Sequence, residues 1–364
     1  MLQTQTGRPS WWSLFGFPLV AALVFGFVAV GMALATGLPL RDPDGLLGPS
    51  YVRLPLIVGG MIALDLLPRA AMRARSARRM PVAVVTVFRE KWPWSRLAVV
   101  AAGLASFYIT YVAYRNLKSF LPFVRKDLVD YELVASDLWL AGGNHPAEVL
   151  HNLLGTGVTA QVLSFVYVFF LFFVPFSLAA ALVWSDKISQ GAWYVSALSF
   201  NWILGTASYY ALPSLGPIYV ERFRFEGLPS TGVSGLQRAL LRNRVEVLSD
   251  PQATQSVQGI AAFASLHVSI VFTAALIAHL VGLPRLVRWA LWVFVGMTAV
   301  ATVYFGWHYL VDVFAGLAVG AIAVGLGYLA VRRRHHVSSE RVHEGPGRLP
   351  EGHDAPAGAE AGHR

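Results

Sequence analysis

The sequence predicts an all-α, polytopic membrane helical bundle of about eight transmembrane helices. Of its 364 residues, 55% are hydrophobic and 13% are charged, with a mean hydropathy of +0.54, which is too apolar for an ordinary soluble domain. The apolar residues form runs close to the ~20 residues needed to cross a hydrocarbon core of about 30 Å. The basic residues fall mainly between these runs.

Eight apolar segments account for the predicted bundle. In chain order they are Leu14–Leu38, Tyr51–Leu67, Leu97–Tyr114, Thr159–Trp184, Ala192–Leu212, Ile260–Leu283, Val287–Phe305 and Tyr309–Val331. The second is short and contains Pro55 and Asp65, both unusual in an apolar helix. The first resembles a signal anchor but has no small-residue cleavage site after it, so we retain it as a helix.

Basic residues between the segments predict the orientation, because cytoplasmic loops are rich in Lys and Arg. A basic loop with the single acid Glu90 separates the second and third segments. Its basic residues are Arg69, Arg73, Arg75, Arg78, Arg79, Arg89, Lys91 and Arg96. Lys187, the Arg285–Arg288 turn and Arg332–Arg334 then fall on the same side. We therefore expect a bacterial plasma membrane protein with both termini in the cytoplasm.

The opposite side receives the longer loops, Arg115–Val158 and Pro213–Gly259, and the turn at Gly306–His308. Within the first loop, Phe123–Leu140 is either an interfacial helix or a solvated loop. The tail from His335 to Arg364 lacks apolar periodicity and is expected to be disordered. Its histidines suit a solvated linker better than a weak metal site; they are His335, His336, His343, His353 and His363.

Composition also excludes several classes of function. The chain has no cysteine, which excludes disulfides, thiolate metal sites and cysteine nucleophiles. Its net charge of +9 is spread over loops, which indicates contact with anionic lipid rather than with nucleic acid. No pattern in the sequence calls for a cofactor.

His308 and Asp312 are four residues apart at the start of the last apolar segment. On a helix this spacing places both on one face. A carboxylate near a span costs a few kcal/mol unless it is paired or hydrated, and a histidine one turn away is a suitable partner. Asp312 would fix the imidazole tautomer and leave the other nitrogen as a base or nucleophile. The alternative is a His–Asp pair that only ties helices together.

The stretch "AAFASLHVS" holds Ser265 and His267 at the start of the sixth segment. In a regular helix they would point about 200° apart, so they act together more readily if the helix begins there. The free N–H groups of a helix start bind anions, with Ser265 as a further donor. A phosphate held there would lie near His267 and, across the bundle, near His308.

Donors for such a phosphate are expected from "YYALPSLGPIYVERFRF", in the outer loop before this stretch. It contains Tyr209, Tyr210, Arg222 and Arg224. Arg238, Arg242 and Arg244 follow farther along the loop. Arg222 and Arg224 rank first because they follow the Pro213–Pro217 turn most closely.

A Pro-containing outer loop, Ser-x-His at the next helix start and His-x3-Asp two helices later together resemble the type 2 phosphatidic acid phosphatase superfamily. The closest resemblance is to its inositol phosphorylceramide synthase-like (inositolphosphotransferase) branch. The family motifs are Lys-x6-Arg-Pro, Pro-Ser-x-His and Ser-Arg-x5-His-x3-Asp. The resemblance implies a six-helix catalytic core over residues 97–331, an N-terminal addition (1–96) of two transmembrane helices with a basic cytoplasmic loop, and a tail (332–364).

The resemblance also implies roles for the matching residues. His308 would attack the phosphorus to form a phosphohistidine, and Asp312 would orient it. His267 would protonate the leaving oxygen, and Ser265 would help to hold the phosphate.

The sequence departs from all three family motifs, and two of the departures remove cationic residues. Ala264 replaces the motif proline, Thr302 stands at the motif arginine, and the first motif is absent as written. Instead, "YYALPSLGP" is similar to the Tyr-x3-Pro-x2-Gly-Pro pattern of the synthase-like branch, which brings no lysine. The phosphate charge must then be met by other groups, with Arg222 or Arg224 expected.

Three functions remain open from the sequence. The first is a membrane enzyme that moves a phosphoryl group from a lipid phosphate or phosphodiester, either to water as a phosphatase or to an alcohol or sugar headgroup as a phosphotransferase. The second is a metal-dependent membrane hydrolase, with the two histidines and Asp312 as ligands. The third is a transporter or a non-catalytic structural relative, in which His308 and Asp312 relay protons or tie helices.

Overall fold

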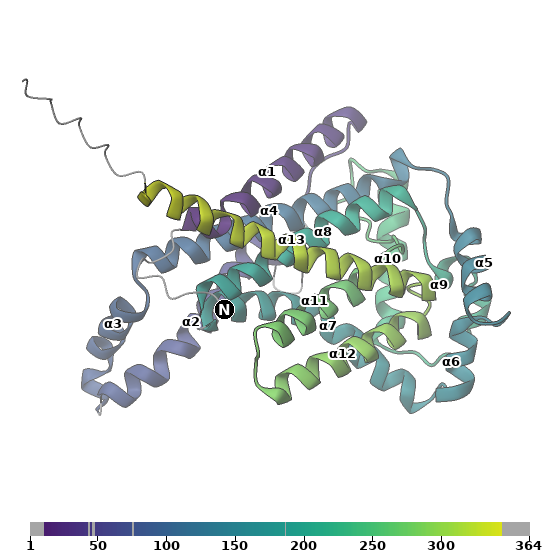
Figure 1. Ribbon diagram of the computed structural model, residues 1–364. Helices are drawn as coiled ribbons and strands as arrows, with labels where there is room; N and C mark the ends of the chain where they lie inside the picture. Colours follow the sequence, from purple (N-terminus) through teal and green to yellow (C-terminus); the bar gives the residue numbers. More distant parts are fainter. Residues whose placement is uncertain (1–10, 43, 46–47, 75, 186, 344–364) are drawn as a thin grey trace, which may run out of the picture.

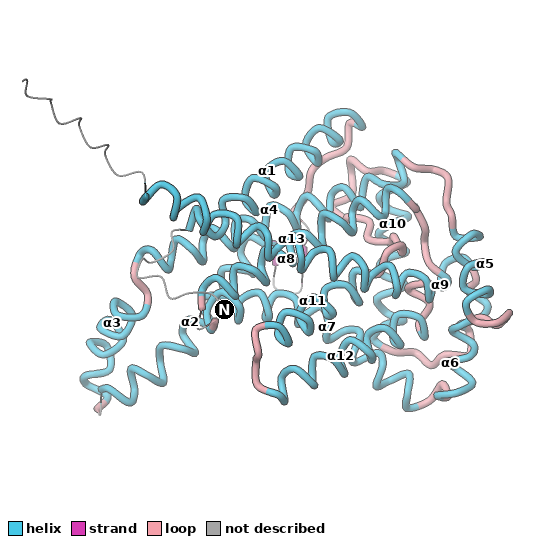
Figure 2. Tube along the Cα trace, viewed as in Figure 1, coloured by secondary structure: helices cyan, strands magenta, loops and turns pink. Residues whose placement is uncertain are grey.

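The computed structural model describes residues 11–42, 44–45, 48–74, 76–185 and 187–343, with backbone alone for 44–45, 48 and 333–343. These residues form thirteen α-helices, and the only strands among them are two antiparallel strands of two residues each. Long helices lie beside one another, and the short helices α5, α6 and α9 gather at one end of the bundle (Figure 1). Much of the loop backbone lies at that end too (Figure 2). The predicted all-α class is confirmed.

The long helices correspond to the eight predicted apolar segments. They are α1 (Trp11–Thr36), α2 (Ser50–Ala74), α4 (Trp94–Val124), α7 (Val158–Trp184), α8 (Ile188–Ala211), α11 (Leu266–Leu280), α12 (Arg285–Tyr304) and α13 (Leu310–His343).

Shorter elements connect them. They are β1 (Asp44–Gly45), β2 (Gly48–Pro49), η1 (Ala77–Arg79), α3 (Met80–Lys91), α5 (Asp130–Leu140), α6 (Pro146–Leu154), α9 (Pro217–Val220), η2 (Arg222–Phe225) and α10 (Gly232–Ser249). The structure thus places a helix, α3, inside the segment that the sequence analysis treated as a basic loop.

Six helices are long and apolar enough to cross a membrane: α1, α2, α4, α7, α12 and the Leu310–Arg332 part of α13. The chain is therefore a membrane-type helical protein, but the count of eight spans is not confirmed. Helix α8 is long enough yet too polar to be counted, because it carries buried Ser196, Ser199 and Thr206. Their hydroxyls donate to carbonyls one turn earlier. Such a helix suits a place among other helices better than contact with lipid.

Helix α11 has 15 residues, or about 22 Å, less than the thickness of a hydrocarbon core. The predicted segment began at Ile260, but the helix begins only after Ser265, whose Oγ accepts a hydrogen bond from the N–H of Val268. Ala262 N–H donates to the carbonyl of Ser214, and Phe263 N–H to Ser214 Oγ. Because these backbone donors have partners outside a helix, the segment can stay non-helical.

Other boundaries differ from the predictions at prolines and at helix ends. Helix α2 continues through Pro55 and Pro68 to Ala74, well past the predicted Leu67. Of the two readings of Phe123–Leu140, the structure favours the helix, since α5 covers its second half. Helix α13 runs on to His343, into the tail expected to be disordered. The rest of that tail, residues 344–364, lies outside the described residues.

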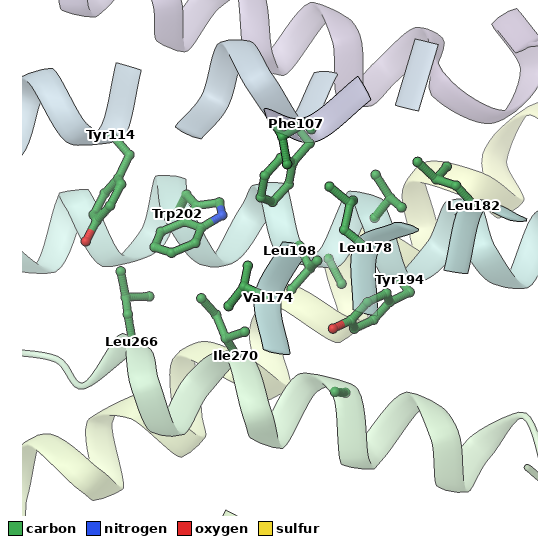
Figure 3. Close-up of a cluster of buried hydrophobic side chains, with 14 of the residues drawn as sticks. Phe107, Tyr114, Val174, Leu178, Leu182, Tyr194, Leu198, Trp202, Leu266 and Ile270 are labelled. Atoms are coloured by element: carbon green, nitrogen blue, oxygen red, sulfur yellow. The ribbon is translucent and has the colours of Figure 1, made fainter. Parts of the chain in front are cut away.

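The main apolar core lies where α4, α7, α8 and α11 meet (Figure 3). Phe107 of α4, Leu178 of α7, Leu198 of α8 and Ile270 of α11 are each at most 2% exposed. Burial of each such side chain stabilises the fold by roughly 1.5–3 kcal/mol. The core thereby holds α4 and α11 on the same central helix, α8.

Helices α11 and α13 cross with their backbones in close contact, because α13 carries glycine at the crossing. A Cβ atom on Gly316 would lie 2.5 Å from the carbonyl oxygen of Ser265, and one on Gly320 would lie 2.8 Å from that of Ser269. Small residues at helix crossings allow this approach in membrane bundles. The crossing brings the start of α13 beside the start of α11.

We expect Gly316→Ala to lower the free energy of unfolding by about 1–3 kcal/mol, because the added methyl must displace the Ser265 backbone. Thermal unfolding of the purified protein in detergent measures the effect. Gly325→Ala, on the same helix and with nothing within 4 Å of the added carbon, is the matched control and should be neutral or slightly stabilising. Equal effects of the two substitutions would contradict the close crossing.

Candidate active site

The two histidines that the sequence predicts near one phosphate are in contact with each other. His267 lies in the first turn of α11, and His308 lies in the turn between α12 and α13. Nε2 of His308 is 3.4 Å from Nδ1 of His267. His308 is only 4% exposed and His267 is partly buried, so the contact lies largely inside this end of the bundle.

Asp312 connects the segments that carry the two histidines. Its Oδ2 lies 3.3 Å from Nδ1 of His308 and accepts a hydrogen bond from the Tyr309 N–H at 3.0 Å. Its backbone carbonyl accepts the Ser265 N–H at 3.1 Å. His308 precedes α13, which begins at Leu310, so the predicted pairing arises across the helix start rather than along one face. With Nδ1 directed at Asp312, Nε2 of His308 is directed at His267.

Aromatic side chains hold the His267 ring. Tyr167 stacks on it with ring centroids 4.6 Å apart, and Phe170 packs against it at 4.4 Å. Tyr167 stacks in turn on Trp307, the residue before His308. This aromatic stack restricts the orientation of His267 without adding charge.

Both histidines line one cavity of about 180 Å³. Its walls also include Tyr209, Lys118 and Arg115, together with aromatic residues of α4, α7 and α8. A water molecule occupies about 30 Å³ in the liquid, so the cavity has room for a phosphoryl group. A smaller, apolar cavity of about 80 Å³ shares Tyr111, Phe170, Leu171 and Trp202 with it and extends to Leu54 of α2.

The structure brings Tyr209 to the cavity, as the sequence predicted, but not all of the other candidates. Ser265 is fully buried, and its Oγ caps α11 instead of lining the cavity. Arg222 lines a separate pocket of about 360 Å³ with Arg238. Tyr210 donates a hydrogen bond to the carbonyl of Leu117.

Arg224 is engaged elsewhere. Its Nε is 2.9 Å from Glu221 Oε1, and its Nη1 is 2.5 Å from Glu148 Oε1. It lines a pocket of about 20 Å³ that includes His308 but not His267. This guanidinium already has two carboxylate partners, and Arg224 does not line the cavity that holds His267.

Sequence reasoning missed two cations on α4. Arg115 and Lys118 lie three residues apart, hence on one helix face, and both line the cavity of the histidines. The predicted span ended at Tyr114, which placed both in an outer loop; the helix in fact continues to Val124. Two basic residues at this spacing next to an apolar run were the signal that could have identified them.

Two carboxylates of α5 were also missed as site residues. Asp130, 3% exposed, accepts hydrogen bonds from the N–H groups of Leu215 and Gly216 and from the Tyr309 hydroxyl. Asp137 accepts the N–H groups of Leu310 and Val311 at the start of α13. Carboxylates stabilise a helix N-terminus. Helix α5 therefore holds both the Pro213–Pro217 turn and the segment that carries His308.

The two residues that replace motif residues, Thr302 and Ala264, form hydrogen bonds within the turns at the site. Thr302, at the motif arginine position, donates its hydroxyl to the carbonyl of Ala299, and its own carbonyl accepts the N–H groups of Trp307 and His308. Ala264 donates its N–H to Ser208 Oγ at 3.0 Å. Both residues thus shape the turns that hold the histidines and bring no charge to the cavity.

No group of three or more His, Asp or Glu side chains placed to hold a metal ion occurs within the described ranges. His267, His308 and Asp312 form a chain of contacts, with His308 in the middle. That order suits orientation of one histidine by a carboxylate.

Comparison with known proteins gives one family. A family model described as the PAP2 superfamily matches residues 132–326, more than half of the chain, and the match includes every residue of the two histidine segments. No curated protein and no solved structure matches the chain. Helix α4, with Arg115 and Lys118, precedes the matched region.

The pH dependence of stability tests the anchoring of α13 by α5. Burial raises the pKa of Asp137 to about 6, although its two backbone hydrogen bonds favour the charged form. Between about pH 4 and pH 6 the folded protein therefore holds a proton on Asp137 that the unfolded chain, in which this carboxyl has its ordinary pKa of 3.8, has lost. The stability of the wild type relative to Asp137→Asn should fall as the pH rises from 4 to 7. Thermal unfolding at several pH values measures this difference, and a constant difference would contradict it.

Proposed function

The chain belongs to the PAP2 superfamily, and from that premise we propose that it is an integral membrane enzyme that transfers a phosphoryl group from a lipid phosphate or phosphodiester. The observation that carries the proposal is the contact of 3.4 Å between Nε2 of His308 and Nδ1 of His267 at the wall of a single cavity. Asp312 lies behind His308, and cationic side chains lie in the same cavity.

In the first half-reaction, neutral His308 attacks the phosphorus with Nε2. A P–N bond forms as the bond from phosphorus to the leaving oxygen breaks, and protonated His267 gives its proton to that oxygen. The Nδ1–H of His308 donates to Asp312, whose carboxylate stabilises the positive ring of the phosphohistidine. The lipid alcohol then leaves.

In the second half-reaction, the oxygen of an acceptor attacks the same phosphorus and gives its proton to His267. The P–N bond breaks and His308 is regenerated. Water as acceptor makes the protein a phosphatase, and an alcohol or sugar headgroup makes it a phosphotransferase. We propose the phosphotransferase of the synthase-like branch, because Tyr209 of the Tyr-x3-Pro-x2-Gly-Pro pattern lines the cavity.

The apolar neighbouring cavity supports a lipid substrate. It shares its aromatic wall with the histidine cavity and is lined by Leu54 and Val174, on helices that are long and apolar enough to span a membrane, and by Arg53. A phosphate ester with an apolar chain would place its headgroup beside the histidines and its chain along these side chains. A small water-soluble phosphate would leave this apolar surface without a partner.

We propose that the site faces the outside of a bacterial plasma membrane, with both termini in the cytoplasm; the distribution of basic residues supports this orientation. The chain contains no cysteine, so single-cysteine labelling is clean. Lys126→Cys, an exposed position at the site end of the bundle, should react with a membrane-impermeant maleimide on intact cells. Reaction only after lysis would contradict the orientation.

Turnover of a lipid phosphate by the purified protein in mixed micelles tests the activity. His308→Ala should lower turnover by about 10³-fold or more, because it removes the nucleophile. His267→Ala should lower it by about 10²–10⁴-fold, because it removes the proton donor.

His279→Ala is the matched control for these variants, since His279 is an exposed histidine on the same helix as His267, and it should leave turnover within twofold of wild type. Chelation with EDTA should have no effect. Turnover that persists in His308→Ala would support the transporter or structural alternative, and loss of turnover on chelation would support the metal-dependent hydrolase.

A further inference from the structure

Lys118 is a buried cation without a buried anion beside it. It is 8% exposed, and its ammonium lies 4.5 Å from the centroid of the Tyr209 ring. Its Nζ donates a long hydrogen bond to the Tyr114 hydroxyl at 3.4 Å. In the described part of the chain, no carboxylate forms an ion pair with it. A buried charge without a counter-ion destabilises a protein, so such a residue beside a cavity is a candidate for binding an anionic ligand.

Arg115 extends this positive charge along the same face of α4. It forms no ion pair within the described residues, and its buried Nε has no hydrogen-bond partner there. Its Nη1 atom lies 3.6 Å from where a Cβ on Gly259 would be, so the guanidinium lies beside the loop that leads to Ser265. A planar guanidinium with free N–H groups matches the oxygens of a phosphate.

Gln258 fixes these cations relative to the histidines. It is fully buried, and its Nε2 donates to the carbonyl of Lys118 at 2.6 Å. Its N–H donates to Ser119 Oγ, and its Oε1 accepts the Ile260 N–H. The backbone of α4 at Lys118 is thereby joined to the segment that ends at Ser265 and His267. Charges held in place before substrate binds are the most effective at stabilising a transition state.

The two arginines that the sequence ranked first, Arg222 and Arg224, lie outside the cavity of the histidines, and Arg244 is directed at Gln258 Oε1, at 3.4 Å. Arg224 is paired with two glutamates, Arg222 lines a separate pocket, and Thr302 replaces the motif arginine. Arg115 and Lys118 share the cavity with His267 and His308.

We infer that Lys118 and Arg115 form the phosphate clamp of this site, supplied by a helix outside the region that matches the family. The ligand is the phosphoryl group of the substrate, held between α4 and the two histidines. The inference rests on the proposed function and assigns the charge that this function requires. Lys118 acts as a point charge, and Arg115 donates from its fork to two oxygens of the same phosphate.

Binding of orthovanadate, an inorganic phosphate analogue, tests the clamp separately from turnover. Lys118→Gln and Arg115→Gln should each weaken orthovanadate binding to the purified full-length protein by about tenfold or more, measured by calorimetry. Both should lower kcat/KM for a lipid phosphate by a similar factor. Lys118→Arg should retain more binding than Lys118→Gln. Lys126→Gln removes an exposed positive charge near the same end of the bundle and should change neither quantity more than twofold.

If a glutamine variant folds poorly, the change in Tm that orthovanadate causes in Lys118→Met tests the clamp instead. Lys118→Met removes the uncompensated charge, so its Tm without ligand should equal or exceed that of wild type. Orthovanadate should raise the Tm of wild type and not that of Lys118→Met. An equal rise in both would overturn the clamp.

The outcomes also separate the clamp from the proposed function. Variants of Lys118 and Arg115 that bind orthovanadate and turn over lipid phosphate like wild type, while His308→Ala is inactive, would overturn the clamp alone. A wild-type protein that binds orthovanadate but does not act on lipid phosphates would contradict the lipid as the source of the phosphoryl group. A wild-type protein that neither binds orthovanadate nor turns over lipid phosphates would overturn both.

Discussion

The hydrogen bond from the Ser265 N–H to the backbone carbonyl of Asp312 is the contact on which the candidate site depends. It joins the start of α11 to the start of α13, and the side chain of the same aspartate lies against His308. Glycine at the crossing of the two helices allows this contact, because a side chain at Gly316 would displace the Ser265 backbone. The two histidines, 41 residues apart in sequence, meet because these two helix starts are held together.

Charge is divided across the site in a way that suits phosphoryl transfer. Acidic groups lie behind His308, where Asp312 contacts its Nδ1 and Asp137 binds the start of α13. Basic groups line the cavity in front, on α4. A phosphate entering the cavity would meet positive charge and the Nε2 side of His308, whereas Asp312 contacts the opposite nitrogen. The division arises because α5 supplies the carboxylates that hold the Pro213–Pro217 turn and the start of α13, whereas α4 supplies the cations that line the cavity.

Much of this arrangement could be predicted from the sequence, and the misses have physical reasons. Apolar runs identified all eight long helices, and the His-x3-Asp spacing identified the pairing of His308 with Asp312. Proximity in sequence to the Pro213–Pro217 turn favoured Arg222 and Arg224, which line other pockets, whereas Arg115 and Lys118 reach the cavity of the histidines by helix packing. Asp130 and Asp137 were overlooked because their partners are backbone N–H groups 85 and 173 residues away, which no local pattern encodes.

The central claim is that His308 carries the phosphoryl group, and a trapped phosphoenzyme tests it most directly. Purified protein is mixed with a lipid phosphate labelled on phosphorus, quenched with base and digested, and the labelled peptide is identified. We expect label that is stable in base, lost in acid and attached to His308, with none on His308→Ala and normal labelling of His279→Ala. Label that persists on His308→Ala, or a wild type that turns over substrate without ever becoming labelled, would contradict it.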